Sequence, residues 1–145
     1  MDVKGNEMLR LENQMCFPLY VCSKEVIRRY KPFLDPLDLT YTQYITLMVL
    51  WEKETIVVKD LGDRLYLDSG TLTPVLKKLE AKGYIERRRC AQDERSVIVT
   101  LTEQGRALQE KAGCVPQQMS ACVVLTQEER AQLRGLLQKM LDHMI

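Results

Sequence analysis

The chain has 145 residues, of which 46% are apolar, and its 21 Lys and Arg against 20 Asp and Glu leave a net charge of +1. Chains of this length bury about 70% of their unfolded surface, so a core can form without disulfide bonds. No apolar run approaches the ~18 residues of a membrane span and the first residues lack an apolar signal segment, so we expect no membrane partner and no secretory leader. The five cysteines are then expected as thiols of a reducing, cytoplasmic compartment.

Residues 6–31 predict one long helix, because apolar side chains recur along them at intervals of three and four. This stripe consists of Met8, Leu11, Met15, Leu19, Cys22, Val26 and Tyr30. Pro18 lacks an N–H for the preceding turn, so we expect a kink beside Cys16. The Lys31-Pro32 pair is expected to end the helix.

A second, very apolar helix is predicted from a capping box at Thr40 and Gln43 through Trp51. A short β-prone piece at residues 56–58 and a brief helix at residues 59–65 follow it.

The next helix is predicted to begin at the capping residues 68–71 and to end at Gly83. Its buried face consists of Leu72, Val75, Leu76 and Leu79. From Tyr84 to Leu101 the apolar period changes from helical to alternating around a polar tip at residues 91–94, which predicts a β-hairpin.

Two more helices complete the predicted chain. One starts at Thr102 and is expected to bend at Pro116, and the other starts at the capping box of Thr126 and Glu129. The fold class is therefore mainly α with a small β-hairpin wing, in a single domain over residues 1–145. Residues 56–101 read as a winged helix-turn-helix. Residues 6–31 and 102–145 supply apolar stripes that one small domain cannot easily bury, which favours a dimer.

The charge is unevenly distributed and predicts contact with DNA. Residues 74–95 hold seven Lys or Arg and four Asp or Glu, a net charge of +3, against −2 over the rest of the chain. Side chains on the outer face of the predicted recognition helix suit phosphates and base edges in a major groove; they are Ser69, Thr71, Thr73, Lys77 and Lys78. Arg87, Arg88, Arg89 and Arg95 of the hairpin would flank the backbone or the minor groove. The plainer interpretation is a solvated helix face beside charges that guard an edge strand.

Cys16 differs from the other cysteines because tyrosines surround it in the sequence. Tyr20 follows one turn later, and Tyr30 and Tyr41 bracket the loop to the second helix. Phenol hydroxyls that donate hydrogen bonds favour a thiolate, although the sequence alone does not bring Tyr30 and Tyr41 to Cys16.

The remaining cysteines divide by position. Cys22, Cys90 and Cys114 are expected to be inert thiols. A disulfide between Cys16 and Cys22 is disfavoured because six helical residues separate them by about 9 Å. A disulfide between Cys16 and Cys122 across a dimer is geometrically open, and Cys114 is the weaker alternative.

Four stretches of the sequence resemble the MarR family of winged-helix regulators, in particular its organic-hydroperoxide-sensing (OhrR) branch. They are LENQMCFPLY (11–20), LTYTQY (39–44), LYLDSGTLTPVLKKL (65–79) and DERS (93–96), so the resemblance spans nearly the whole chain in order. It implies a homodimeric repressor bound to a pseudo-palindromic operator in double-stranded DNA. In that branch, organic hydroperoxides or hypochlorite oxidise a cysteine in the amino-terminal helix and release the DNA.

The resemblance also implies roles for single residues. Cys16 falls on the peroxidatic position, and Tyr30 and Tyr41 fall on tyrosines that contact this cysteine from the partner subunit. Asp93 and Arg95 fall on the wing pair, in which the arginine enters the minor groove and the aspartate orients it. Cys122 lies close to the position of the resolving cysteine that some members have.

Two residues depart from the pattern of the branch. Pro18 and Thr42 stand where the branch usually has a helix former and a proline. The sensing pocket is therefore expected to be reshaped, and electrophiles or quinones are alternative signals.

Three other functions are open from the sequence. One is a MarR-type regulator that a small phenolic ligand releases, with Cys16 structural. Another is a thiol peroxidase, but no basic residue neighbours Cys16, so an enzyme is not expected. A metal sensor is least favoured because Cys16, Cys22 and His143 lack a metal-ligand spacing, and no cofactor or metal is expected.

Overall fold

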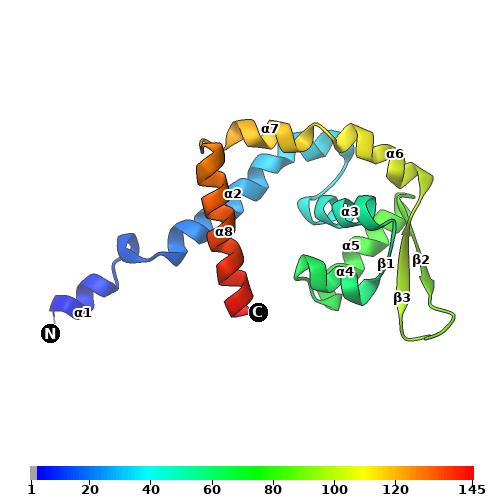
Figure 1. Cartoon of the computed structure of the whole chain (residues 1–145), viewed down its shortest axis with the longest axis horizontal. Coiled ribbons are helices and arrows are strands. Elements are labelled where there is room, and N and C mark those ends of the chain that lie inside the picture. The colour runs from blue at the N-terminus through cyan, green and yellow to red at the C-terminus, as the bar shows by residue number, and fades with distance from the viewer. Residues whose placement is uncertain (1–2) are drawn as a thin grey trace. The chain divides into compact units, whose positions relative to one another are not determined.

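A computed structural model describes residues 3–145 of the chain. The chain divides into two compact units, Met1–Val115 and Pro116–Ile145 (Figure 1). The first unit contains α1 (Val3–Met8), η1 (Leu11–Asn13), α2 (Cys16–Leu34), η2 (Asp35–Leu37), α3 (Tyr41–Lys53), β1 (Thr55–Val57), α4 (Val58–Leu65), α5 (Ser69–Ala81), β2 (Ile85–Arg89), β3 (Val97–Leu101) and α6 (Glu103–Ala112). Helix α7 (Val115–Cys122) begins at the boundary, and α8 (Gln127–Met144) lies in the second unit.

The predicted class, mainly α with a small β wing, is confirmed. The predicted hairpin is part of a three-stranded antiparallel sheet in the order β1-β3-β2. In its register Ile56 lies opposite Val99, and Arg87 lies opposite the same residue from the other side. Strand β1 therefore joins the wing to the helix-turn-helix formed by α4 and α5.

The core of the first unit is built from the predicted inner faces. Leu47 and Leu50 of α3, Leu79 of α5 and Val99 of β3 are fully buried. Burial of one such side chain contributes about 1.5–3 kcal/mol. Because α3, α5 and β3 share this core, the recognition helix and the wing are held on the same scaffold.

The prediction of one continuous amino-terminal helix is wrong. The chain leaves the helical conformation between α1 and α2, and Gln14 is extended, with φ −89° and ψ 115°. Pro18 occupies the third position of α2, where a missing N–H has no intrahelical acceptor to lose. Pro18 therefore marks the start of a helix and does not kink one.

Two amide side chains stabilise this break. Asn13 Nδ2 donates to the Glu7 carbonyl at 2.7 Å, and Gln14 Nε2 donates to the Met8 carbonyl at 2.6 Å. Such side chains compete with the backbone for its hydrogen-bonding groups. The apolar spacing continues through the break, which is why it predicted a single helix.

The expected ends of two other helices also shift. Helix α2 continues past Pro32 to Leu34, because a proline this close to the carboxyl end costs only one backbone hydrogen bond. The predicted fifth helix, which was expected to bend at Pro116, is two helices, because α6 ends at Ala112 with Gly113 as its C-cap, and Pro116 lies in the first turn of α7.

No helix within residues 3–145 combines the length and apolar character needed to cross a bilayer. In the same part of the chain, no group of three or more His, Cys, Asp or Glu side chains could hold a metal ion.

Candidate nucleic-acid interface and sensing thiol

Helix α5 presents the polar face that the sequence predicted. The Asp68 side chain caps its first turn by accepting the Thr71 N–H at 2.7 Å. The inner residues of α5 are buried, and the outer residues Ser69, Thr71, Lys77 and Lys78 are exposed, while Thr73 is half-buried. Hydroxyl and ammonium groups therefore line one accessible side of this helix.

The turn after α5 fixes the direction of the wing. Gly83 has φ 80°, a conformation that glycine adopts without strain. Its N–H donates to the Glu80 carbonyl at 2.9 Å, and the Tyr84 N–H donates to the Leu79 carbonyl at 3.1 Å, which is the Schellman pattern of a helix end. Thr102 adds a bond from its hydroxyl to the Gly83 carbonyl at 2.6 Å.

Arg87 connects the wing to α5. Its guanidinium donates to Glu80 Oε2 from Nε at 3.0 Å and from Nη2 at 2.7 Å, and its backbone N–H reaches Glu80 Oε1 at 3.3 Å. These bonds lower the pKa of Glu80, with the side-chain hydrogen bond as the largest cause. Arg87 was predicted to face DNA, but its charge is paired here, so it braces the hairpin against the recognition helix.

Replacing Glu80 with Gln should loosen this brace. Because Arg87 lowers the pKa of Glu80 in the folded protein, the pair is intact at neutral pH and is lost as the pH falls through that lowered pKa. The variant should therefore show faster amide hydrogen exchange in β2 than the wild type at pH 7, with little change in the midpoint of thermal unfolding. Equal exchange rates at Arg87 in the two proteins would show that the pair does not hold the wing.

The wing carries exposed cations in β2 and at its tip. Arg88 and Arg95 are exposed. Asp93 holds the tip, because its carboxylate accepts the Arg95 backbone N–H at 3.0 Å and the Ser96 hydroxyl at 3.1 Å. Asp93 thus fixes the backbone at Arg95, while the guanidinium of Arg95 extends outward.

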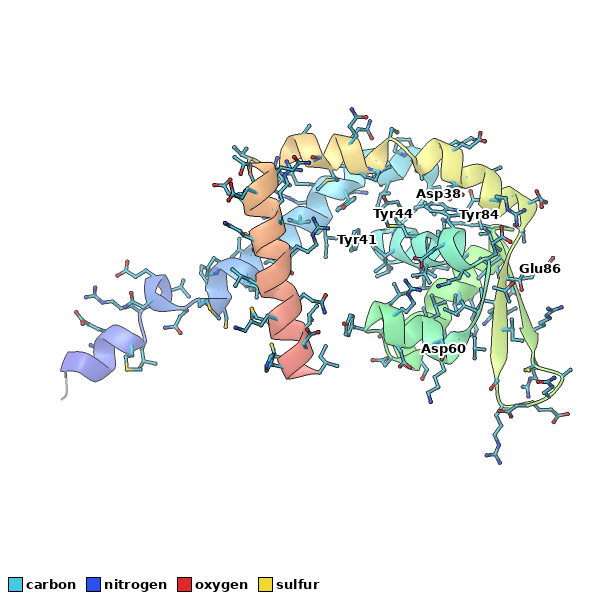
Figure 2. All side chains as sticks on the ribbon, in the orientation of Figure 1. Asp38, Tyr41, Tyr44, Asp60, Tyr84 and Glu86 are labelled. Atoms are coloured by element: carbon cyan, nitrogen blue, oxygen red, sulfur yellow. The ribbon has the colours of Figure 1, made fainter. Side chains whose placement is uncertain are left out.

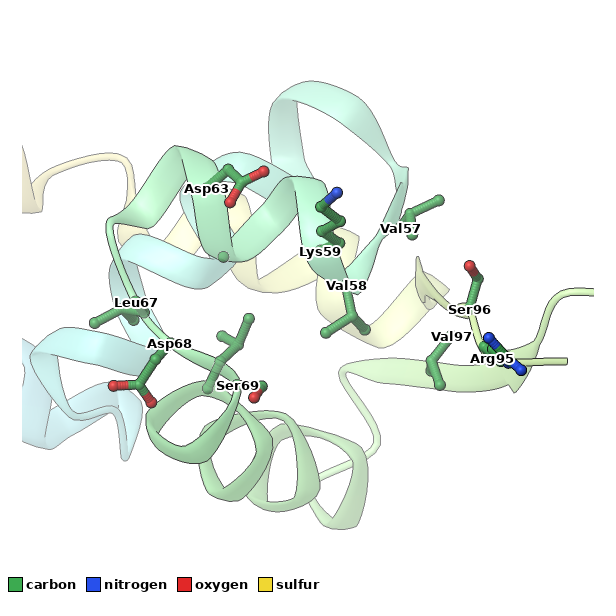
Figure 3. A pocket seen from close by; sticks show the side chains of 12 residues that line it. Val57, Val58, Lys59, Asp63, Leu67, Asp68, Ser69, Arg95, Ser96 and Val97 are labelled. Atoms are coloured by element: carbon green, nitrogen blue, oxygen red, sulfur yellow. The ribbon is translucent and has the colours of Figure 1, made fainter. Parts of the chain in front are cut away.

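A groove of about 410 Å³ lies between the recognition helix and the wing (Figure 3). Ser69 at the start of α5 and Arg95 of the wing both line it, and its other polar side chains are Lys59, Asp63, Asp68 and Ser96. The structure therefore places the predicted helix face and the predicted wing arginine on two sides of one depression.

Cys16 is the first residue of α2, and its side chain is exposed. Tyr20, one turn later, is 58% exposed. Its ring lies under the Lys24 ammonium, with Nζ 4.6 Å from the ring centroid. The thiol that the sequence singled out is therefore accessible at the amino end of a long helix.

Tyr30 and Tyr41 form a cluster with a third tyrosine that the sequence analysis missed. The Tyr30 and Tyr41 ring centroids are 4.9 Å apart, and Tyr44, which is 3% exposed, lies 5.9 Å from Tyr30 and 6.5 Å from Tyr41 (Figure 2). Burial raises the pKa of all three phenols, so their hydroxyls remain donors at neutral pH. The spacing of Tyr41 and Tyr44 on one helix face was the available signal.

Cys16 does not meet this cluster within its own chain. Cys16 and Tyr30 lie on the same helix, fourteen residues apart, which corresponds to about 21 Å along its axis. A site that contains both the thiol and the tyrosines therefore needs two copies of the chain.

The other cysteines are also unpaired thiols in the structure. Cys22 and Cys114 are exposed, whereas Cys90 and Cys122 are half-buried. Cys90 lies at the base of the wing tip, where its N–H donates to the Ser96 carbonyl at 2.8 Å. Cys122 ends α7.

Apolar side chains remain exposed in both units. In the first unit most of them lie between residues 8 and 27, including Met8, Leu9, Leu11, Met15, Phe17, Leu19, Val26 and Ile27, and Met48 and Tyr66 are exposed as well. In the second unit they include Leu125, Leu133, Leu136, Met144 and Ile145. Apolar surface of this extent is typical of protein–protein contact.

The chain has known relatives in sequence and in structure. A family model described as Transcriptional regulator SarA/Rot matches residues 28–112. The chain is 48% identical over 134 residues to the organic hydroperoxide resistance transcriptional regulator of Bacillus subtilis. The matched stretch covers 92% of this chain and 91% of the relative.

Two solved structures of AbfR from Staphylococcus epidermidis are similar to the fold. Reduced AbfR bound to DNA has a TM-score of 0.79 at 37% identity, over 98% of this chain and 99% of that one. The disulfide form of AbfR has a TM-score of 0.68 at 36% identity, over 97% and 96% of the two chains.

Proposed function

This chain belongs to the MarR family of winged-helix transcriptional regulators, in the branch of organic hydroperoxide resistance regulators, and we propose that it is a homodimeric repressor that is inactivated by oxidation of Cys16. The reduced dimer binds a pseudo-palindromic operator, and oxidation of Cys16 by an organic hydroperoxide releases it. The chain acts as a DNA-binding switch and not as an enzyme.

The position of Cys16 carries this proposal. Cys16 is exposed at the amino end of α2, where the helix dipole favours a negative charge. The Tyr30 phenol lies about 21 Å farther along the same helix, and Tyr41 of α3 packs against it, so only the partner subunit can supply these donors to Cys16. The exposed apolar residues between positions 8 and 27 provide a surface for that partner.

The reading head is the exposed face of α5 together with the wing. In a helix-turn-helix dimer, the two recognition helices enter major grooves about one DNA turn, roughly 34 Å, apart. Lys77 and Lys78 would contact phosphates and Arg95 would enter the minor groove, as the charge of the segment indicates.

The switch chemistry is a two-electron oxidation of one sulfur. The Cys16 thiolate attacks the terminal oxygen of the hydroperoxide, the O–O bond breaks, and the alkoxide leaves as an alcohol after taking a proton. The Cys122 thiolate of the partner then attacks the sulfenic sulfur, which forms a disulfide and displaces hydroxide, and the hydroxide takes up a proton to become water. Joining thiols of two separate helices requires those helices to move, which changes the spacing of the recognition helices.

The proposal is tested with a duplex that the reduced protein selects from a random DNA pool. Fluorescence polarisation should show tight binding by the reduced protein, release by cumene hydroperoxide, and recovery after dithiothreitol. A small phenol that releases the reduced protein while hydroperoxide has no effect would contradict the thiol switch and favour a ligand-controlled regulator.

Arg95→Ala tests the wing contact. Each dimer loses two guanidinium groups, so we expect operator affinity to fall roughly 10- to 100-fold and the slope of log K against log salt to fall by about 2. The matched control is Arg28→Ala, which removes an exposed arginine of α2 that pairs with Glu25 at 2.8 Å. Equal affinities and slopes for the two variants would show that the wing does not contact DNA.

A further inference from the structure

We propose that Lys82 is a positioning residue that ties the carboxyl end of the recognition helix to the first turn of α3, so that a change at the tyrosine cluster reaches the DNA-reading face. The inference deepens the proposed function and rests on it for its biological meaning. Its physical content is a fixed connection between two helices.

The ammonium group of Lys82 is fully engaged across this junction. Nζ donates to the backbone carbonyl of Asp38, lies 3.2 Å from Asp38 Oδ2, and lies 3.3 Å from Gln43 Oε1. A lysine ammonium has three donors, and these three acceptors use them. The side chain is 26% exposed, so it is directed into the protein, unlike the exposed Lys77 and Lys78.

The α3 end of the connection is rigid. Gln43 is 3% exposed. Its Oε1 also accepts the Thr40 N–H at 3.1 Å, as part of the capping box that begins α3. Asp38 lies in the turn before α3 (Figure 2), where it adopts a left-handed conformation with φ 53°. A shift of the first turn of α3 therefore moves the acceptors of Lys82.

The first turn of α3 also carries the tyrosine cluster. Tyr41 is the first residue of α3, two positions before Gln43, and its ring packs against Tyr30. Any rearrangement that separates Tyr41 from Tyr30 acts on the same turn that holds Lys82. The tyrosine cluster and the acceptors of Lys82 therefore share the first turn of α3.

The α5 end leads directly to the reading head. Lys82 is the C-cap of α5, and its N–H donates to the Lys78 carbonyl at 3.1 Å. Gly83 follows at once and sets the direction of the wing. Displacement of Lys82 thus changes the position of both the recognition helix and the hairpin, which is the physical requirement for coupling between distant sites.

A double-mutant cycle on operator affinity tests this role. The four proteins are wild type, Tyr41→Ala, Lys82→Met and the double variant, in the reduced state. Tyr41→Ala removes the ring that packs on Tyr30, and Lys82→Met keeps the stem while removing the three donors. We expect Tyr41→Ala to weaken binding about fivefold or more in the wild type and less than about twofold in the Lys82→Met background. Lys78→Met, one turn earlier on α5, is the matched control and should leave the Tyr41 effect intact.

Three results would overturn the role of Lys82. Additive effects in the cycle would mean that Lys82 only stabilises the fold. No effect of Tyr41→Ala in either background would mean that nothing reaches α5 from α3. A salt slope that falls for Lys82→Met as it does for Lys78→Met would mean that Lys82 contacts phosphate directly. If hydroperoxide fails to release the wild type from DNA, the proposed thiol switch is wrong. The double-mutant cycle still tests whether Lys82 connects α3 to α5, because it uses only reduced protein.

Discussion

Cys16→Ser should remain bound to its operator through a hydroperoxide treatment that releases the wild-type protein. Serine keeps the size and the hydrogen-bonding character of the side chain but is not oxidised by hydroperoxide at neutral pH. Because Cys16 is exposed at the start of α2, the substitution should leave the fold and the reduced-state affinity unchanged. We expect the dissociation constant of the wild type to rise by at least about tenfold on oxidation, within the usual range of allosteric coupling, and that of the variant to change less than twofold.

Cys22→Ser is the matched control for this experiment. Cys22 is an exposed thiol on the same helix, and it should be dispensable. Release of the operator by hydroperoxide in Cys16→Ser would contradict the proposed switch. Steady consumption of hydroperoxide by a protein that does not bind DNA would favour a thiol peroxidase.

The thiol that pairs with oxidised Cys16 is identified by gel electrophoresis after the same hydroperoxide treatment. Cys122→Ser should still be oxidised at Cys16 but should form no disulfide-linked dimer on a non-reducing gel, whereas Cys114→Ser should form it as the wild type does. The opposite pattern would assign the resolving role to Cys114. Linked dimers in both variants would exclude a unique resolving thiol.

The helix starts and the wing could be predicted because their signals are local. Thr40 and Thr126 each form both hydrogen bonds of a capping box with the residue three positions later, so four residues of sequence are enough. The change of apolar period after Gly83 likewise predicts the strands β2 and β3. These elements depend on their neighbours in the sequence and not on distant packing.

The parts that could not be predicted depend on contacts between distant residues. The apolar spacing of the amino-terminal segment matches a single helix, but many of its side chains are exposed in the chain, so no packing in one subunit enforces continuity across residues 9–15. The break follows from Pro18 and from the amides of Asn13 and Gln14.

In the candidate site, the contacts of Lys82 and Arg87 could not be predicted from the sequence for the same reason. In the sequence, Lys82 is one of several cations and nothing distinguishes it from Lys77 or Lys78. Its contact with Gln43 joins residues 39 positions apart. The pairing of Arg87 with Glu80 depends on the turn at Gly83, so the sequence counted Arg87 among the cations that face DNA.

Gly105→Ala should destabilise the protein more than an alanine at Gly62, Gly70, Gly83 or Gly113 would. A Cβ at Gly105 would lie 2.2 Å from the Tyr84 carbonyl oxygen, 2.7 Å from Leu101 Cδ1 and 3.1 Å from the Tyr84 carbonyl carbon. The Tyr84 carbonyl is fixed because it accepts the Thr102 N–H at 3.0 Å. The Gly105 carbonyl is also fixed, since it accepts Trp51 Nε1 at 2.9 Å. Backbone on both sides must shift, and we expect a loss of about 3 kcal/mol in the free energy of unfolding.

Urea unfolding at a fixed protein concentration measures this effect, because oligomerisation makes the apparent stability depend on concentration. Gly135→Ala is the control: apart from the neighbouring backbone of α8 itself, nothing in the chain lies within 4 Å of a Cβ added there. Helical geometry places Gly135 on the face of α8 opposite Leu133 and Leu137, so alanine should stabilise the helix by about 0.5–1 kcal/mol. A Gly105→Ala variant as stable as the wild type would show that β3 and α6 can separate without cost. In that case the junction between the wing and α6 would be flexible, and the position of the wing would be set by the Gly83 turn, the pairing of β1 with β3 and the Glu80–Arg87 brace.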